Sequence, residues 1–124
     1  MKEREEAYIL VINRNEMVKV LIRDIVYVES FSRKIFVYTE NGTYSEYEKL
    51  DNFAMKLPDN FYRCHKRCII NLDKVRVLGN NTVVFEDDSR IVMCKEKFQK
   101  LKQAYKGHAI RKNMIVVNEK QLQI

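Results

Sequence analysis

The chain has 124 residues, a hydrophobic fraction of 46% and a formal net charge of +6. This length accommodates one ordinary domain but not two, and a hydrophobic fraction in the normal range lets it fold without disulfides or a structural metal. No apolar run approaches the roughly 18 residues of a membrane-spanning helix, and the charged N-terminus is not followed by a signal-peptide core, so we expect a cytoplasmic protein with no membrane partner.

Short β-prone runs separated by turn residues predict strands in the first part of the chain. These strands cover residues 8–12, 18–22, 25–28 and 35–39. Asn41-Gly42 comes next, and because both residues tolerate the positive φ of a type I′ turn, they predict a tight hairpin. Strands this closely spaced cannot be joined by helical crossovers, so we expect largely antiparallel sheets.

Two segments break the β pattern and predict helices. Ser45 and Glu48 have the spacing of a capping box, and apolar residues at helical spacing follow until Pro58 ends the helix. A second helix is predicted over residues 95–105, with Gly107 as its stop. The apolar faces of both helices are most simply explained by packing against the core.

The last part of the chain continues the β pattern and then changes. Asn80-Asn81 and Asp87-Asp88 are turn signals between the predicted strands 75–78, 82–85 and 90–93. Residues 114–117 are strand-like, and they either add an edge strand or belong to a loosely held tail. We therefore predict a domain over residues 1–107 and a C-terminal extension over residues 108–124.

The charge is unevenly distributed along the chain. Residues 1–62 carry 9 Lys+Arg and 11 Asp+Glu, whereas residues 63–124 carry 14 and 6. A basic half on a near-neutral domain is typical of a polyanion-binding surface, although charge alone fits a generic solvated face equally well. Nucleic acid is favoured over a membrane surface because no basic amphipathic helix with a continuous apolar face is present.

Residues 61–71 hold the densest set of chemically active side chains. Cys64, Cys68 and Cys94 do not form the paired knuckles of a structural zinc site, and we expect no metal. His65 adjoins Cys64 along a strand, so the two side chains should point to opposite faces, which disfavours a catalytic pair. The thiols are expected to be core or half-buried, with a reversible redox role left open because neighbouring cations could lower a thiol pKa.

The sequence gives no further support for an enzymatic function. Three glycines in the whole chain leave little backbone for a phosphate-binding loop. The carboxylates of Asp87 and Asp88 are explained by turn chemistry. We expect no catalysis, no cofactor and no small-molecule substrate.

Cationic side chains stand at the ends of three predicted elements, where loops project. They belong to Arg33-Lys34, Lys66-Arg67 and the segment from Lys95 to Lys97. Arginine can donate bidentately to guanine in the major groove, and lysine can bind a base edge or a phosphate. A β-rich chain without an obvious recognition helix would have to read DNA with such loops.

The sequence resembles the LytTR DNA-binding domain, which is found mostly at the C-terminus of bacterial response regulators in two-component systems. The resemblance covers about residues 8–105 and begins at residues 24–30. It is strongest across residues 61–71, which read Phe-Tyr-Arg-Cys-His-Lys-Arg-Cys-Ile-Ile-Asn, and ends with the helix after Cys94. The order and spacing of these segments make the match far more specific than a lone short motif.

This resemblance implies a mostly-β fold, an elongated β-β-β arrangement of small antiparallel sheets with two short helices. It also implies transcription regulation through double-stranded DNA, with loop side chains in successive major grooves, a bent duplex and two copies on repeated half-sites. The contact loops map to residues 32–34, to Lys66 just after His65, and to residues 95–97. The expected DNA-binding side chains are those of Arg33, Lys34, His65, Lys66, Arg67, Lys95 and Lys97.

Some features depart from the family pattern. Cys94 stands where a serine usually caps the final helix, and Glu96 near the third contact would repel phosphate. The family usually carries a receiver domain, whose alternating strands and helices are not seen here, so the chain is either a stand-alone regulator or one domain of a longer protein.

An alternative function is a β-rich protein-interaction or sensory module without DNA binding, in which residues 114–117 recruit another chain.

Overall fold

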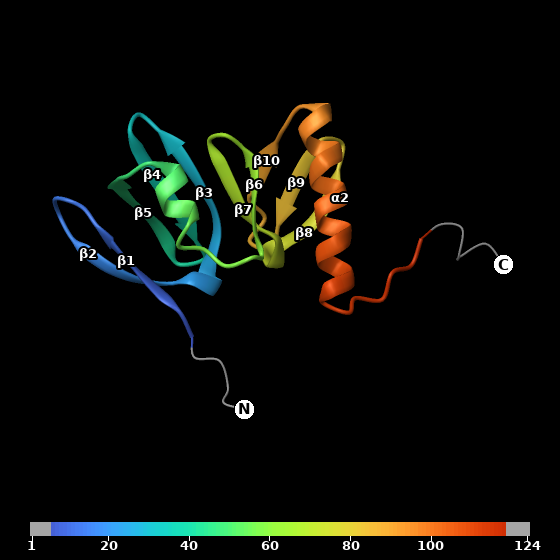
Figure 1. Cartoon of the computed structure of the whole chain (residues 1–124), viewed down its shortest axis with the longest axis horizontal. Coiled ribbons are helices and arrows are strands. Elements are labelled where there is room, and N and C mark those ends of the chain that lie inside the picture. The colour runs from blue at the N-terminus through green and yellow to red at the C-terminus, as the bar shows by residue number, and fades with distance from the viewer. Residues whose placement is uncertain (1–5, 119–124) are drawn as a thin grey trace.

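The computed structural model describes residues 6–118, and this part of the chain forms three antiparallel sheets with two α-helices (Figure 1). Along the chain the elements are β1 (Tyr8–Ile12), β2 (Met17–Leu21), β3 (Ile25–Phe31), β4 (Lys34–Thr39), β5 (Gly42–Tyr47), α1 (Leu50–Ala54), β6 (Phe61–His65), β7 (Cys68–Asn71), β8 (Val75–Gly79), β9 (Thr82–Phe85), β10 (Arg90–Val92) and α2 (Lys95–Arg111). The predicted mostly-β class with small antiparallel sheets and two helices is confirmed. Within residues 6–118, no helix combines the length and apolar character needed to cross a bilayer.

The three sheets follow one another along the longest axis of the molecule. The β1–β2 hairpin lies at one end, the five-stranded sheet β5-β4-β3-β7-β6 in the middle, and the sheet β10-β9-β8 with α2 towards the other end (Figure 1). Every strand pair is antiparallel. This is the elongated three-part arrangement that the family resemblance implies.

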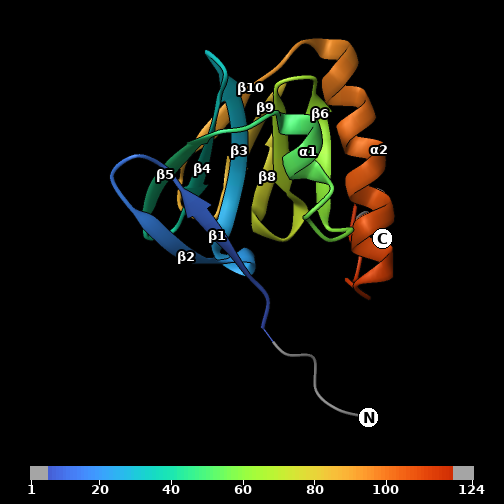
Figure 2. The same ribbon diagram turned by 60° about the vertical axis from the view of Figure 1, so that its left-hand side comes forward.

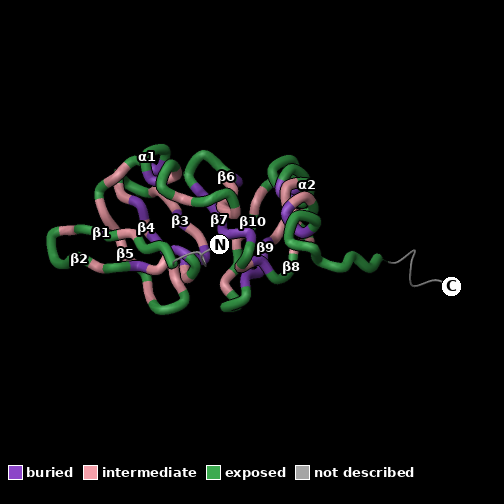
Figure 3. The backbone as a smooth tube through the Cα atoms, turned by 60° about the horizontal axis from the view of Figure 1, so that its bottom comes forward, coloured by how far each residue is buried: buried purple, intermediate pink, exposed green. Residues whose placement is uncertain are grey.

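The central sheet is buried on both faces, and each face has its own core. On one face, Val28 packs with residues of β1, β2 and α1. On the other, Val26 packs with residues of β8, β9 and α2. A bulge in β3 between Ile25 and Tyr27 shifts the register against β4, which lets Ile25 and Val28, three residues apart, face the same core. The buried segments of Figure 3 accordingly run through the middle of the molecule.

Asn71, the last residue of the 61–71 segment, has a structural role. It is almost fully buried, and its side-chain amide donates to the carbonyl oxygen of Ile25 at 2.8 Å. Its side-chain oxygen accepts from the backbone N–H of Asp73 and from the side chain of Asn60. Removing a buried group with this many partners would leave unpaired donors and acceptors behind, so Asn71 holds β7 against β3 and its neighbouring loops.

The Asn41-Gly42 hairpin forms, but not with the predicted turn residues. Thr39 pairs with Gly42, so Glu40 and Asn41 make the loop, and only Gly42 has a positive φ, of 155°. The Thr39 hydroxyl accepts from the Asn41 N–H at 3.0 Å and donates to the Gly42 carbonyl at 2.8 Å. This side chain fixes the turn one residue earlier than the type I′ prediction.

The predicted capping box is wrong. Ser45 belongs to β5, where it pairs with Phe36 of β4, and the Glu48 carboxylate accepts from the N–H of Lys49. Helix α1 begins at Leu50 without a side-chain cap and ends at Ala54. The sheet ladder extends further than local helix signals suggest, because pairing with β4 satisfies the backbone of this segment.

Helix α2 does not stop at Gly107, as predicted, but continues to Arg111. His108 and Ala109 are buried, and Nε2 of His108 lies 2.8 Å from Oδ1 of Asp73. These tertiary contacts outweigh the weak helix propensity of glycine. After the helix, the chain turns at Asn113, whose φ is 60°. The strand suggested for residues 114–117 is not formed, and these residues are exposed.

Candidate nucleic-acid interface

The three predicted contact elements lie along one edge of the molecule. In Figure 1 the β3–β4 turn, the β6–β7 turn and the start of α2 all lie at the top, and Figure 2 shows the same grouping after rotation. The topology explains this placement, because β3 and β7 are antiparallel neighbours in the central sheet. The backbone N–H of Ser30 also donates to the carbonyl of Arg67 at 2.9 Å, which ties the two hairpins together near their tips.

The first contact element is a two-residue turn in a strained backbone conformation. Phe31 pairs with Lys34, and Ser32 and Arg33 between them have φ values of 54° and 68°. The type I′ geometry that matches strand twist needs positive φ at both positions, which costs a non-glycine residue about 1 kcal/mol. Arg33 is exposed, whereas the Lys34 ammonium lies 5.1 Å from the centre of the Tyr47 ring.

The second contact element is the Lys66-Arg67 turn, which is held from below by Arg63. The Nε of Arg63 donates to the His65 carbonyl at 3.0 Å, and one Nη donates to the Lys66 carbonyl. The same Nη also contacts the Asp51 carboxylate of α1 at 3.0 Å. Because a planar guanidinium offers several donors in fixed directions, it can bind all three acceptors at once.

His65 is oriented by the same turn. Its Nδ1 accepts from the backbone N–H of Arg67 at 3.1 Å, so in the neutral ring the hydrogen is on Nε2. The residue is exposed, as are Lys66 and Arg67. His65 can therefore donate from Nε2 to an acceptor outside the protein.

The third contact element is the first turn of α2, which carries Lys95 and Lys97 on its exposed surface. Cys94 occupies the N-cap and makes no side-chain capping bond, in line with the expected weakening of the cap. Glu96 lies 3.9 Å from Lys100, a weak exposed pair that offsets part of its repulsion toward an anion. The positive end of the helix dipole also points to this edge.

Surface depressions connect the three elements. Arg33 and Lys66 line one depression together with Lys49 of the β5–α1 connection. His65 and Lys66 line a second one with Lys97. Among the described residues, no carboxylate pairs with any of the seven side chains predicted to bind DNA. The lysine and arginine side chains of this set are therefore not neutralised by an ion pair within the described part of the chain.

Sequence reasoning missed three residues of this edge. Lys100 lies three residues after Lys97, and helical spacing could have indicated that both line the same depression. The capping-box pattern places Lys49 inside a helix, whereas α1 begins only at Leu50. The sequence shows Arg63 only as one more cation, because two of its three partners are main-chain oxygens that no sequence pattern reveals.

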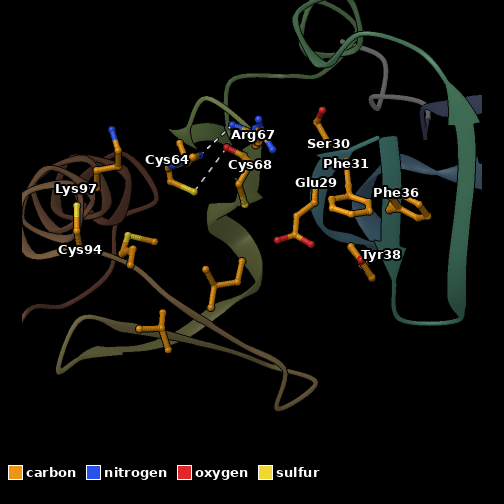
Figure 4. Close-up of a pocket in the computed structure, with 14 residues that line it drawn as sticks. Glu29, Ser30, Phe31, Phe36, Tyr38, Cys64, Arg67, Cys68, Cys94 and Lys97 are labelled. Carbon is orange, nitrogen blue, oxygen red and sulfur yellow. Dashed lines mark hydrogen bonds between the residues drawn. The ribbon is translucent and has the colours of Figure 1, made fainter. Parts of the chain in front are cut away.

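A pocket of about 660 Å³ lies behind the edge, between the central sheet and the start of α2 (Figure 4). All three cysteines line it, two of them buried and Cys94 exposed. The Cys64 thiol donates to the Cys68 carbonyl at 3.6 Å. Hydrogen bonding to the Cys64 thiol and burial raise the pKa of Cys68 well above its ordinary value. Among the described residues, no cluster of three or more His, Cys, Asp or Glu side chains could hold a metal ion.

The domain is elongated and mostly β, and it places cationic turns along one edge. These features are typical of a class of nucleic-acid-binding modules that use loops rather than a single recognition helix. The family model described as the LytTr DNA-binding domain matches residues 15–106, more than half of the chain. The chain belongs to this family of DNA-binding domains of transcriptional regulators, which is not a class of enzymes.

Relatives and solved structures agree with the family match. Transcriptional regulatory protein YpdB of Escherichia coli (strain K12) is 33% identical over 85 residues, which is 65% of this chain and 35% of that protein. YpdB of Shigella flexneri matches to the same extent. The chain thus spans about a third of the length of these relatives. A LytTr DNA-binding domain of a response regulator from Bacillus cereus superposes with a TM-score of 0.68 at 19% identity, covering 83% of this chain and 99% of that chain, and shows the same fold.

Proposed function

We propose that this domain binds double-stranded DNA sequence-specifically and uses its three edge elements to contact successive segments of the duplex. The observation that carries the proposal is that both hairpin turns and the start of α2 share one edge (Figures 1 and 2). Seven side chains would contact the duplex, namely those of Arg33, Lys34, His65, Lys66, Arg67, Lys95 and Lys97.

Five of these side chains fall into two groups by where they stand in the fold. Arg33 and Lys66 stand at turn tips, where an exposed side chain can reach base edges in a groove. Lys34 lies over an aromatic ring, and Lys95 and Lys97 stand at a helix N-terminus, positions suited to phosphate oxygens. Base contacts would supply specificity, and phosphate contacts would set the position of the domain on the duplex.

We further propose that two copies occupy repeated half-sites. A single domain of this size offers few base-reading side chains, whereas two half-sites double the sequence that is read. In a longer regulator, a response-regulator input would then control the occupancy of the pair.

Selection from a random duplex library, followed by shift titration, tests the proposal. Lys66→Ala and Arg33→Ala should each weaken binding to the selected duplex by about 1–3 kcal/mol while changing binding to a scrambled duplex less. Arg14→Ala is the matched control, because Arg14 is an exposed cation on the β1–β2 turn, away from the edge. Equal affinity of both edge variants and the wild type, with the fold intact, would refute the mechanism.

A further inference from the structure

Phe31 is an exposed aromatic residue beside the first contact element. It is the last residue of β3, directly before the Ser32-Arg33 turn, and 66% of it is exposed. Among the described residues, Phe31 belongs to neither hydrophobic core and stacks on no other ring. Because single exposed apolar residues are common on protein surfaces, exposure alone assigns it no role. Its position among the side chains of the edge is more informative.

The fold holds Phe31 between the first and second contact elements. Phe31 pairs with Lys34 across a two-residue turn, which leaves its backbone little freedom. The N–H of Ser30, the preceding residue, donates to the Arg67 carbonyl of the second turn at 2.9 Å. Phe31 also lines the large pocket together with Arg67 and Lys97, two of the side chains proposed to contact DNA (Figure 4). A duplex held by these cations would therefore meet the Phe31 ring.

The sheet face around Phe31 favours an apolar group over a phosphate. Side chains two residues apart on a strand share a face, so Phe31 and Glu29 lie on the same side of β3. Phe36 pairs with Glu29, and its ring lies beside that of Phe31 in Figure 4. An aromatic surface next to a carboxylate repels a phosphate but packs well against a methyl group. In the major groove, the apolar group that the base pairs present is the 5-methyl group of thymine.

We propose that Phe31 is a specificity-determining residue of the DNA interface and contacts the 5-methyl group of a thymine in the major groove. The proposal rests on the proposed function and extends it, because it adds an apolar contact to a set of cationic side chains and a histidine. Two residues of chain span at most about 7 Å, and base pairs stack about 3.4 Å apart. The thymine should therefore lie within about two base-pair steps of the pair that Arg33 contacts.

A thymine-to-uracil scan tests the methyl contact directly. Deoxyuridine pairs as thymidine does but lacks the 5-methyl group, so replacing each thymine of a selected duplex in turn removes one methyl group at a time. For the wild type, we expect one replacement near the Arg33 contact to weaken binding by about 3- to 10-fold, the effect of exposing one methyl-sized group. Phe31→Ala should weaken binding to the thymine duplex by a similar factor and abolish the effect of that replacement. Phe31→Leu, which keeps an apolar side chain, should restore part of both.

Tyr8→Ala is the matched control for loss of an exposed aromatic ring. Tyr8 is exposed, and the Lys19 ammonium lies 4.6 Å from its ring centre, but it belongs to β1, which lies away from the contact edge in Figure 1. This variant should bind the thymine duplex like the wild type and keep the full effect of the uracil replacement. Urea denaturation checks that each variant is folded, as expected for substitutions at exposed positions.

The possible outcomes separate this proposal from the proposed function. If Arg33→Ala and Lys66→Ala weaken specific binding but Phe31→Ala binds like the wild type, the proposed function stands and the Phe31 contact is refuted. The contact is also refuted if the uracil replacement weakens wild type and Phe31→Ala equally, if no replacement affects the wild type, or if the selected site has no thymine at this position. If the wild type selects no duplex at all, the proposed function fails and the Phe31 contact fails with it.

Discussion

Arg63 and Lys66 are joined side chain to main chain: a guanidinium Nη of Arg63 donates to the carbonyl oxygen of Lys66 and, at 3.0 Å, to the carboxylate of Asp51. Arg63 therefore holds the turn in place, whereas Lys66 is the cation that the turn exposes to solvent. Arg63 touches backbone, α1 and the base of the hairpin at once, so it acts as a positioning residue for the Lys66-Arg67 turn.

Arg63→Lys should weaken specific DNA binding severalfold, although the charge is unchanged, because lysine cannot donate to three acceptors in fixed directions. The free energy of unfolding should fall by only about 1 kcal/mol, the usual contribution of an exposed hydrogen-bonding group. Shift titration and urea denaturation measure the two effects. Arg76→Lys is the control, since Arg76 pairs with Asp88 in another sheet. If Arg63→Lys binds DNA with the affinity of the wild type, the Arg63 guanidinium does not position the turn.

Arg33→Gly should stabilise the fold and weaken DNA binding. Glycine adopts the φ of 68° without steric cost, so the free energy of unfolding should rise by about 0.5–1 kcal/mol. Thermal denaturation should show a gain in stability, and shift titration should show a loss of DNA affinity. Asn81→Gly, at a φ of 58° in the β8–β9 turn, is expected to stabilise less and leave DNA binding unchanged. A destabilised Arg33→Gly protein would contradict the strain argument.

Gly107→Ala should raise the free energy of unfolding by about 0.5–1 kcal/mol, because Gly107 lies inside α2 and glycine is costly in a helix interior. An added Cβ would lie 3.4 Å from the Arg111 guanidinium, which is flexible enough to move. Urea denaturation measures the change. A chain that ends at residue 107 should instead be destabilised, since it loses the buried His108 and Ala109. Destabilisation by Gly107→Ala would argue against a continuous helix.

Tyr27 should make the fold sensitive to high pH. Burial, followed by the nearby Glu29 carboxylate, raises the pKa of Tyr27 to about 12 from the ordinary 10.0. An unfolded chain therefore loses this proton before the folded chain does, so stability is unaffected below pH 10 and falls between pH 10 and about 12. Urea midpoints at pH 9 and 11 measure the fall, and Tyr27→Phe should reduce it. An equal fall in Tyr27→Phe would assign the effect to other groups.

The three thiols should differ in reactivity with iodoacetamide. Cys94 is exposed and should be labelled in the native protein, whereas Cys64 and Cys68 are buried and should be labelled only after unfolding. Because Cys94 occupies the N-cap position of α2, on the edge proposed to contact DNA, a bound duplex should slow its labelling. Mass spectrometry of peptides from timed reactions measures all three. Labelling of Cys94 at the same rate with and without a selected duplex would count against α2 as a contact element.

Much of the fold could be predicted from alternating apolar residues and from turn residues with a defined geometry. The Asn80-Asn81 turn is one example, because asparagine tolerates the positive φ that both positions adopt. The end of α2 could not be predicted in this way, since it depends on the contact between His108 and Asp73, which are far apart in sequence. The false capping box has the same origin, as pairing of β5 with β4 overrides a local helix signal.

The candidate site was only partly predictable. Cations at the ends of predicted strands identified both hairpin turns, and the topology then explains why Arg33 and Lys66 share an edge. The strain at Ser32 and Arg33 could not be predicted, because neither residue is typical of a turn with positive φ. The role of Arg63 could not be predicted either, since side-chain donation to main-chain carbonyls depends on the folded hairpin.

The pairing of β3 with β7 fixes the distance between the two hairpin turns proposed to contact DNA. The β3–β4 and β6–β7 hairpins occupy four adjacent strands, so their midlines stand two strand spacings apart, about 10 Å. That distance corresponds to roughly three base-pair steps of the duplex. Under the proposed function, the number of base pairs between the positions that the two tips contact would therefore be set by the hydrogen bonds of the sheet rather than by flexible loops. Inserting a single pair between them should cost affinity that no change of side chain at either tip can restore.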